Sequence, residues 1–346
     1  MIPRLGQLDA TDSAPLPRRR SILLHVTWLM LVCMMLGAPV VSAVTLNGYA
    51  YVSLPDVATR FGMDHKWRIR GQEAAISSQW SDLRFTLHQS HFSYNGQKIY
   101  LVEPIALYGG NLHVAEVDYE NTIKPLFFPQ QYDPKPKLYH IVLDPGHGGK
   151  DSGAQNSSLK LKEKHLALDL ANRVKSRLER YGYKVTLTRT NDEFIDLSER
   201  PQIANRLNAD LFVSLHFNAI NSAKVDGIET YVFTPAGHAS TNAKSADSRS
   251  YPGNQDAPWS MLAGYHIQSQ MIEKTRADDR GLKRARFAVL KTLNCPGVLV
   301  EGGFVSNPTE GRNIGSAAYR DKLADAIVSG ILNYQKAINR ARGIDS

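Results

Sequence analysis

Two histidines and two glutamates stand where this sequence is expected to do chemistry. His147 lies in the glycine-rich run HIVLDPGHGGKDSGA (140–154), just after an apolar segment, while His216 and Glu301 each end an apolar segment of their own. Glu163 lies in the first turns of the helix predicted after the His147 loop. Two imidazoles and one carboxylate are a known ligand set for catalytic zinc, which keeps its fourth position for water.

The fourth residue of the set would be a carboxylate that does not bind the metal. Zinc lowers the pKa of a bound water to about 7 and polarises a carbonyl. A neighbouring carboxylate can take the proton of that water and pass it to a leaving nitrogen. A set of this kind would hydrolyse an amide.

Each of the four residues also has an ordinary interpretation when it is taken alone. His147 fits a turn histidine, or a loop that binds phosphate through its N–H groups. His216 fits a buried core histidine, and Glu163 fits a solvated helix face. Glu301 fits a carboxylate bonded to neighbouring N–H groups. Their predicted convergence on one site is what favours the metal-dependent interpretation.

The elements that must bring these residues together alternate between strand and helix. From about residue 138, apolar runs of strand length alternate with segments of helical period, such as the apolar positions four residues apart from Leu166 to Leu178. This alternation predicts an α/β fold with a largely parallel, twisted sheet and helices on both faces. The predicted strands are 141–143, 184–188, 211–215, 228–233 and 298–300, and the predicted helices are 161–181, 197–207, 258–277 and 316–340.

This fold class explains why the four residues should meet. Sheets of parallel strands bind ligands outside the carboxyl ends of their strands, which is where His147, His216 and Glu301 are predicted to lie. The glycines around His147 would let the backbone bend sharply. Asp144 is expected either to orient a ligand imidazole from behind or to cap the loop.

A small β-rich domain is predicted before this one, over residues 44–128. It contains short alternating runs, a short helix after Leu54-Pro55, and Asn95-Gly96, which is a strong signal for a hairpin turn. Residues 129–137 are rich in proline and glutamine, which is typical of an extended linker. The second domain is therefore placed at 138–340.

Residues 1–43 have the composition of an export signal. Arg18-Arg19-Arg20 precede an apolar stretch that ends in Val41-Ser42-Ala43, so cleavage after Ala43 is expected. An uncleaved membrane anchor is the alternative, because about 20 apolar residues can span a bilayer. The protein is therefore expected to be exported to the periplasm or cell wall. Only Cys295 would remain in the mature chain, which excludes an internal disulfide.

The charge balance disfavours nucleic acid as a partner. The chain has 41 Lys and Arg against 33 Asp and Glu, a net charge of +8. The basic residues are spread along the sequence apart from the triple arginine, whereas a nucleic-acid site would concentrate them. A basic excess also suits an anionic surface such as a membrane or a cell wall.

The motifs around the four residues resemble those of the zinc-dependent N-acetylmuramoyl-L-alanine amidases of type 3, over about 139–338. The resemblance implies one Zn²⁺ per catalytic domain, held by His147, Glu163 and His216, with Glu301 as the catalytic base and acid. It also implies hydrolysis of the amide between N-acetylmuramic acid and L-alanine in peptidoglycan. The motifs are LDPGHGG (143–149), KEK (162–164), ADLFVSLHFNA (209–219), VEGGFVSN (300–307) and, more loosely, DRGLK (279–283).

Further expectations follow from this resemblance. Many members carry a regulatory helix that blocks the zinc, whereas residues 234–257 here are polar and rich in Ser, Ala, Asn and Gly. That composition predicts a flexible loop and no built-in plug. An activator protein is possible, and the sequence does not identify one. Phe217 departs from the small residue that is usual beside the second histidine. The first domain resembles the small β domain at the start of copper amine oxidases, with wall attachment or plain packing as alternative roles.

Two other functions stay open at this point. A zinc carboxypeptidase or aminopeptidase would use the same ligands on the same type of fold. A non-catalytic wall-binding protein would keep the fold without the chemistry, but it would not need a proton carrier such as Glu301.

Overall fold

The computed structural model describes residues 43–241, 243 and 245–344. The predicted signal at 1–43, with its triple arginine and Cys33, lies outside the described residues except for Ala43. Within the described ranges, no helix combines the length and apolar character needed to cross a bilayer.

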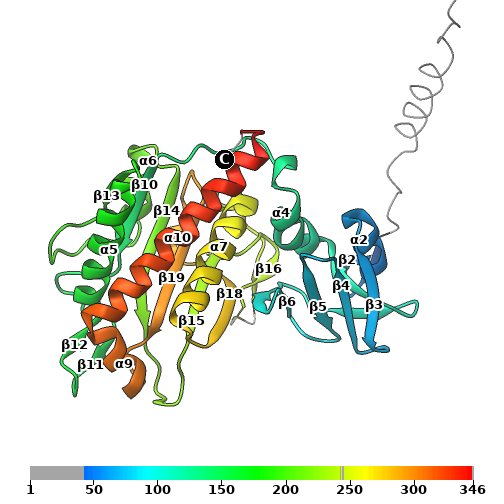
Figure 1. Cartoon of the computed structure of the whole chain (residues 1–346), viewed down its shortest axis with the longest axis horizontal. Coiled ribbons are helices and arrows are strands. Elements are labelled where there is room, and N and C mark those ends of the chain that lie inside the picture. Colours follow the sequence, from blue (N-terminus) through cyan, green and yellow to red (C-terminus); the bar gives the residue numbers. More distant parts are fainter. Residues whose placement is uncertain (1–42, 242, 244, 345–346) are drawn as a thin grey trace, which may run out of the picture. The chain divides into compact units, whose positions relative to one another are not determined.

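Six strands from residues 140–304 form the sheet that carries the predicted site (Figure 1). Every neighbouring pair is parallel except β15 and β19, which are antiparallel. The predicted α/β class with a largely parallel sheet is confirmed, although the sequence predicts no strand at β18. The strand order is β13 (Lys184–Leu187), β10 (His140–Pro145), β14 (Leu211–Asn218), β19 (Gly297–Phe304), β15 (Ile228–Phe233) and β18 (Asp279–Ala285).

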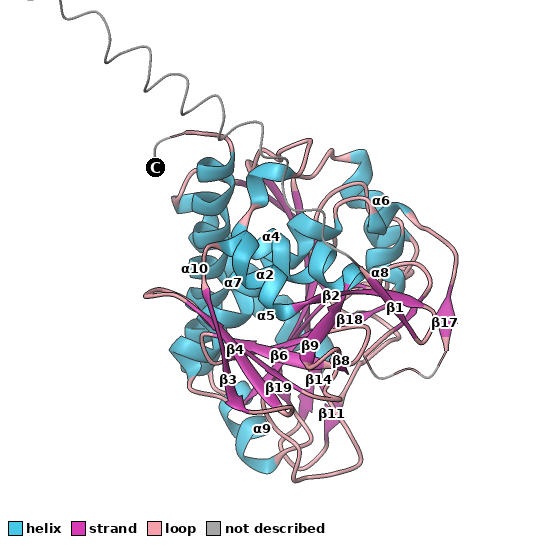
Figure 2. Ribbon diagram, turned by 90° about the vertical axis from the view of Figure 1, so that its right-hand side faces the viewer, coloured by secondary structure: helices cyan, strands magenta, loops and turns pink. Residues whose placement is uncertain are grey.

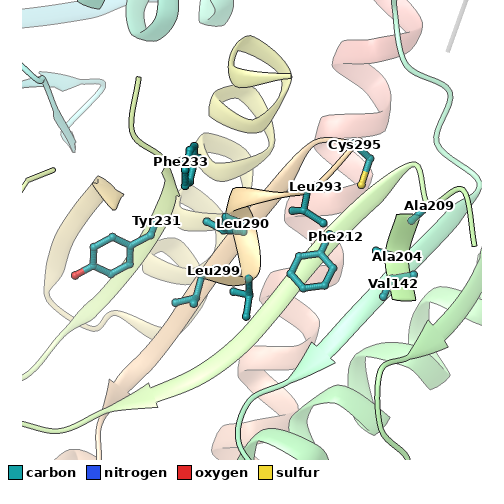
Figure 3. Close-up of a cluster of buried hydrophobic side chains, with 11 residues drawn as sticks. Val142, Ala204, Ala209, Phe212, Tyr231, Phe233, Leu290, Leu293, Cys295 and Leu299 are labelled. Atoms are coloured by element: carbon teal, nitrogen blue, oxygen red, sulfur yellow. The ribbon is translucent and has the colours of Figure 1, made fainter. Parts of the chain in front are cut away.

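Helices cover both faces of this sheet, as predicted. On one face α10 packs against both α5 and α7 (Figure 1). The other face carries α6 and α8, and Figure 3 shows its apolar cluster, in which Ala204 of α6 and Leu290 of α8 pack over Phe212 and Leu299 of the sheet. The four predicted helices, which are α5, α6, α7 and α10, begin and end within two residues of the predicted bounds. The helices are α5 (Glu163–Arg180), α6 (Glu199–Arg206), α7 (Ala257–Thr275), α8 (Ala288–Lys291), α9 (Pro308–Gly315) and α10 (Ala317–Ala341).

The spacing of apolar residues explains how α5 is held. Leu166, Leu170, Val174 and Leu178 recur every four residues and are all buried, with exposed fractions from 0 to 6%. Each such side chain stabilises the fold by about 1.5–3 kcal/mol when it leaves water. This packing fixes the beginning of α5, where Glu163 lies.

Residues 44–131 are β-rich, as predicted, and are called the β-rich half below. Ser53 caps α2 by accepting a hydrogen bond from the backbone N–H of Asp56. Asn95 and Gly96 join β6 to β7 with φ angles of 49° and 86°, which confirms the predicted hairpin turn. The elements are β1 (Val44–Leu46), β2 (Tyr49–Ser53), α2 (Leu54–Phe61), β3 (Asp64–Ile69), β4 (Glu73–Ser77), β5 (Asp82–Thr86), β6 (His91–Tyr94), β7 (Gln97–Tyr100), β8 (Ala106–Tyr108) and β9 (Asn111–Ala115).

Strands of the β-rich half extend the six-stranded sheet that carries the site. Strands β3 to β7 form an antiparallel meander, of which β3, β4 and β6 are labelled in Figures 1 and 2. β7 pairs in parallel with β18 at Ile99 and Leu282. The result is one sheet of 11 strands, beside a four-stranded sheet made by β1, β2, β9 and β8. Short helical segments follow, α3 (Glu116–Asp118), η1 (Tyr119–Ile123), α4 (Lys124–Phe127) and η2 (Pro129–Gln131). The domain boundary at 129–137 stays a prediction.

Candidate active site

The three predicted metal ligands lie together at the carboxyl ends of the central strands. His147 follows β10, His216 lies near the end of β14, and Glu163 is the first residue of α5. One ligand atom from each residue lies within 4.8 Å of the other two. Together with Glu301 they line a cavity of about 430 Å³. The structure thus brings the four predicted residues to one site.

Glu163 holds the two histidines with its two carboxylate oxygens. Its Oε2 lies 3.0 Å from Nε2 of His147, and its Oε1 lies 2.8 Å from Nδ1 of His216. The backbone N–H groups of Ala154 and Phe217 donate to the same two oxygens, at 2.7 and 3.0 Å. Burial alone would raise the pKa of Glu163, but the hydrogen bonds and charges of the two histidines lower it well below its usual range. Glu163 is therefore ionised, as a metal ligand must be.

Asp151 orients His147, and the sequence analysis missed it. Asp151 Oδ2 lies 2.8 Å from Nδ1 of His147, which leaves Nε2 pointing at Glu163. A carboxylate behind a ligand imidazole fixes the ring and makes it a better ligand. Burial lowers the pKa of His147, but hydrogen bonds and charges from Glu163 and Asp151 outweigh burial and raise it. The available signal was a carboxylate four residues after His147 in the same loop.

Two buried arginines hold the backbone of the His147 loop. Arg189 donates to the carbonyls of Pro145 and Gly146 at 2.9 and 2.7 Å. Arg200 donates to the carbonyls of Pro145 and His147 at 2.9 and 2.8 Å. The loop needs this support because His147 has a φ angle of +61°, a left-handed conformation that costs a non-glycine residue free energy.

Asp144 belongs to this support and does not touch a ligand ring. Its carboxylate accepts hydrogen bonds from Thr188 at 2.6 Å, Arg200 at 2.8 Å and Ser214 at 2.8 Å. These contacts fit the loop-holding alternative, and the expectation that Asp144 orients an imidazole is corrected in favour of Asp151.

Two glycines leave room for the ligands. A Cβ atom on Gly146 would lie 2.2 Å from Cε1 of His216. A Cβ atom on Gly153 would lie 2.5 Å from Oε2 of Glu163, and Gly153 also has a φ angle of +62°. Any side chain at these positions would displace a ligand.

Glu301 lies beside the ligands in the middle of the sheet. It is in register with His216 of β14 on one side and with Glu229 of β15 on the other. Its Oε2 is buried and has no hydrogen-bond partner among the described residues. Burial, followed by the charges of Glu163 and Glu229, raises its pKa well above the usual range, while Lys283 opposes the shift. A carboxyl of this kind is suited to taking up and releasing a proton.

Glu229 is a second buried carboxylate that the sequence analysis did not single out. Asn218 and Tyr231 donate to its Oε1 at 2.9 and 2.8 Å, while Arg280 at 3.0 Å and Lys283 donate to its Oε2. Burial would raise the pKa of Glu229, but these partners, Lys283 first, lower it. The available signals were a charged residue inside the apolar run 228–233 and the basic residues of 279–283.

The remaining wall of the cavity is largely apolar. It includes residues of α8 and the loop before it, with Leu299 of β19 and Leu197 of the loop before α6. Phe217 also lines the cavity, but it is fully buried and its ring lies next to Gly302. None of the described residues between 234 and 257 contributes to this lining. Their described part forms β16 (His238–Ala239), β17 (Ala246–Asp247) and the short helix η3 (Pro252–Asn254), and the expected absence of a plug stays a prediction.

The donor set fits a zinc ion. Two imidazole nitrogens and one carboxylate oxygen converge, and zinc sites of hydrolytic enzymes use this combination with one position open to water. The partnerless, buried oxygen of Glu301 lies beside that set, where a carboxylate could act on water.

Comparison with known proteins gives a consistent family. The sequence profile of Amidase_3, described as N-acetylmuramoyl-L-alanine amidase, matches residues 141–333, more than half of the chain. The N-acetylmuramoyl-L-alanine amidase AmiA of Escherichia coli (strain K12) is 35% identical over 234 residues, covering 58% of this chain and 80% of AmiA. The amidase LytC of Bacillus subtilis (strain 168) is 36% identical over 196 residues, covering 57% of this chain and 35% of LytC.

A solved structure is also similar to this chain. The crystal structure of N-acetylmuramoyl-L-alanine amidase from Clostridium difficile 630 is 32% identical. It covers 57% of this chain and 97% of that chain, with a TM-score of 0.49. The β-rich half lies outside the segment that the family profile matches.

Proposed function

The chain belongs to the Amidase_3 family of N-acetylmuramoyl-L-alanine amidases, and on that premise we propose that it is a zinc-dependent hydrolase of peptidoglycan. The bond that it cleaves is the amide between the lactyl group of N-acetylmuramic acid and the first L-alanine of the stem peptide. His147, Glu163 and His216 hold one Zn²⁺, and Glu301 carries the proton.

The observation that carries this proposal is the placement of Glu301. Glu301 lines the cavity in register with His216, and its buried Oε2 has no hydrogen-bond partner among the described residues, while the neighbouring carboxylate of Glu229 has four donors. A purely structural carboxylate would be satisfied in the same way as Glu229, because an unpaired buried polar group is destabilising. Glu301 is therefore kept free for a partner that comes from outside the chain.

The chemistry divides between the metal and the chain. Zinc held by the three ligands would lower the pKa of a bound water and polarise the amide carbonyl. Glu301 takes the proton of the attacking water at its carboxylate as the C–O bond forms. It then donates that proton to the L-alanine nitrogen as the C–N bond breaks. Glu163 stays ionised between the two histidines, and Asp151 keeps His147 aimed at the shared centre.

The apolar wall suits the muramoyl side of the substrate. Leu197, Leu299 and Val289 of α8 present aliphatic surface toward the cavity, and Phe287 before α8 presents aromatic surface. The lactyl and N-acetyl methyl groups are the apolar parts of muramic acid, and they would be removed from water against this wall. The wall thereby helps to position the scissile carbonyl.

The proposal is tested on purified peptidoglycan sacculi with identification of the released products by mass spectrometry. Stem peptides with a free L-alanine amine, lost when a zinc chelator is added, would support the proposal. Trimmed peptides that stay attached to muramic acid would assign the chain to the carboxypeptidase or aminopeptidase class. Retention on the sacculi without any release would favour a binding role or a missing activator.

We also propose that the enzyme works outside the cytoplasmic membrane, in the periplasm or cell wall. The substrate is located there, and residues 1–43 have the pattern of an export signal. Protease accessibility of the chain in intact spheroplasts would test this placement.

A further inference from the structure

The β-rich half of the chain reaches the charged residues that lie directly behind Glu301. A row of residues crosses one face of the sheet in register, from His216 to Glu301, then Glu229, then Gly281 of β18. The next strand after β18 is β7, which belongs to the β-rich half. The row that begins at a predicted zinc ligand thus ends against the other half of the chain.

Lys283 is the cation on which this arrangement depends. It is 4% exposed and forms an ion pair with Oε2 of Glu229. Its ammonium nitrogen also lies 5.5 Å from the ring centroid of Tyr100 and 5.8 Å from that of Tyr231. A cation over aromatic faces is attracted by the negative face of each ring, and more strongly so when it is removed from water. Tyr100 of β7 therefore contributes one of the contacts that keep Lys283 on Glu229.

The junction between β7 and β18 is built for close approach. Gly281 has a φ angle of +94°, and a Cβ atom there would lie 2.9 Å from the carbonyl oxygen of Lys98 and 3.0 Å from Cε2 of Tyr100. Asp279 accepts a hydrogen bond from the backbone N–H of Lys98 at 2.7 Å. The absence of a side chain at Gly281 allows Tyr100 to reach Lys283.

We propose that the β-rich half is a working part of the amidase site, because Tyr100 is a positioning residue that holds Lys283 against Glu229 and so fixes the charges behind Glu301. This inference rests on the proposed role of Glu301 as the proton carrier. It assigns the β-rich half a part in the reaction itself, beyond wall attachment or packing.

The test compares three single variants on sacculi with the zinc-loaded full chain. Tyr100→Leu keeps an apolar side chain but loses the ring face, and we expect kcat to fall on the order of tenfold, with KM and zinc content unchanged. Tyr100→Phe restores the ring face and is expected to recover most of that loss. Tyr94→Leu is the matched control, because Tyr94 of β6 stacks on Tyr265 of α7 at 5.1 Å and also contacts Phe127, and among the described residues its ring does not contact Lys283.

Three results for kcat would overturn the inference. They are an unchanged kcat for Tyr100→Leu, an equal loss for Tyr94→Leu, and a loss that Tyr100→Phe does not recover. A change in KM or in zinc content in place of kcat would also contradict it, since the ligands and the apolar wall are not in contact with Tyr100.

A second measurement does not depend on activity. Urea unfolding of Tyr100→Leu, of the paired variant Glu229→Gln with Lys283→Met, and of their combination forms a double-mutant cycle. The paired change avoids leaving one buried charge without its partner. Effects that fail to add would support the contact, and additive effects would overturn it. If the wild type instead trims peptides that stay attached to muramic acid, the proposed function fails, while this cycle still decides whether Tyr100 holds Lys283.

Discussion

Glu301 lies directly opposite Glu229 in the antiparallel pair of β19 and β15, and the two carboxylates have opposite environments. Glu229 accepts four hydrogen bonds and stays ionised, whereas Oε2 of Glu301 has no partner among the described residues. The charge of Glu229 also helps to raise the pKa of Glu301. The proposed division of roles follows this difference, with Glu229 keeping its charge and Glu301 exchanging the proton.

The first prediction concerns Glu301 itself. Glu301→Gln keeps the shape of the side chain but cannot carry a proton, so turnover should fall by at least about 100-fold. Zinc content should stay at the wild-type level, because Glu301 is not one of the three ligands. His216→Ala should lose both zinc and activity. Product release from sacculi and metal analysis of the purified variants check this, and near-full turnover by Glu301→Gln would remove Glu301 from the mechanism.

The second prediction concerns the residue behind His147. Asp151→Asn should weaken zinc binding by about 10- to 100-fold, because the ring of His147 loses the carboxylate that aims it. Competition with a chelator of known affinity measures the change. Asp321→Asn is a suitable control, since Asp321 pairs with Arg173 and Arg177 on the helices far from the loop. Equal zinc affinities for the two variants would contradict the assignment.

The third prediction separates backbone strain from a clash with a ligand. Gly153 and Gly182 both have positive φ angles, +62° and +86°, but an added Cβ would strike Glu163 and His147 only at Gly153. Both Gly→Ala variants should lose about 1–2 kcal/mol of stability from the left-handed conformation. Only Gly153→Ala should also lose zinc and activity. Thermal unfolding combined with metal analysis distinguishes the two effects, and retention of zinc by Gly153→Ala would show that the ligands can move aside.

The fourth prediction concerns stability and pH. Burial raises the pKa of Asp118 from 3.8 to about 6, although N–H groups of Val102 and Glu103 and the charge of Arg284 act against the shift. The folded state therefore binds this proton more tightly than the unfolded state does. The resulting stabilisation is complete below pH 3.8 and is lost as the pH rises through 6.

Asp118→Asn should remove that part of the pH dependence. The two proteins should have similar stability at pH 4, and the variant should gain up to about 3 kcal/mol relative to the wild type by pH 8. Urea unfolding at both pH values measures the difference. A gap that stays constant with pH would show that Asp118 does not titrate in this range.

The sequence predicts the fold well where apolar spacing decides the structure. The four long helices and the strands that carry the ligands have regular apolar periods, and the structure confirms them. The strand β18 was missed because its sequence DRGLKRA lacks such a period. It becomes a strand through its neighbours, since Lys283 is neutralised by Glu229 and Arg284 donates to Thr122 at 2.8 Å. α8 has only four residues, too few to show a helical period. α9 was also missed, because its sequence PTEGRNIG has few apolar residues.

The residues of the candidate site could likewise be predicted only in part. The four residues at strand ends or at a helix start can be predicted from the topology rule alone, because that rule places them on one side of the sheet. Asp151 and Glu229 act through contacts whose existence depends on the fold of a loop and on strand register. The pairing of Glu229 with Glu301 joins strands that are about 70 residues apart in sequence, and β15 runs antiparallel to β19 in a sheet that was predicted to be largely parallel. Local spacing carries no information on such a pairing.

The union of the two halves also changes which strand ends the sheet. A strand with a neighbour on one side only presents free N–H and C=O groups, which invite another chain to add to the sheet and aggregate. β7 covers that side of β18 and moves the open end to β3, where Asp64, Lys66 and Arg68 alternate along the strand. Charged side chains on a terminal strand oppose such additions. The edge at β3 is thereby less prone to pair with the edge of a second copy of the chain.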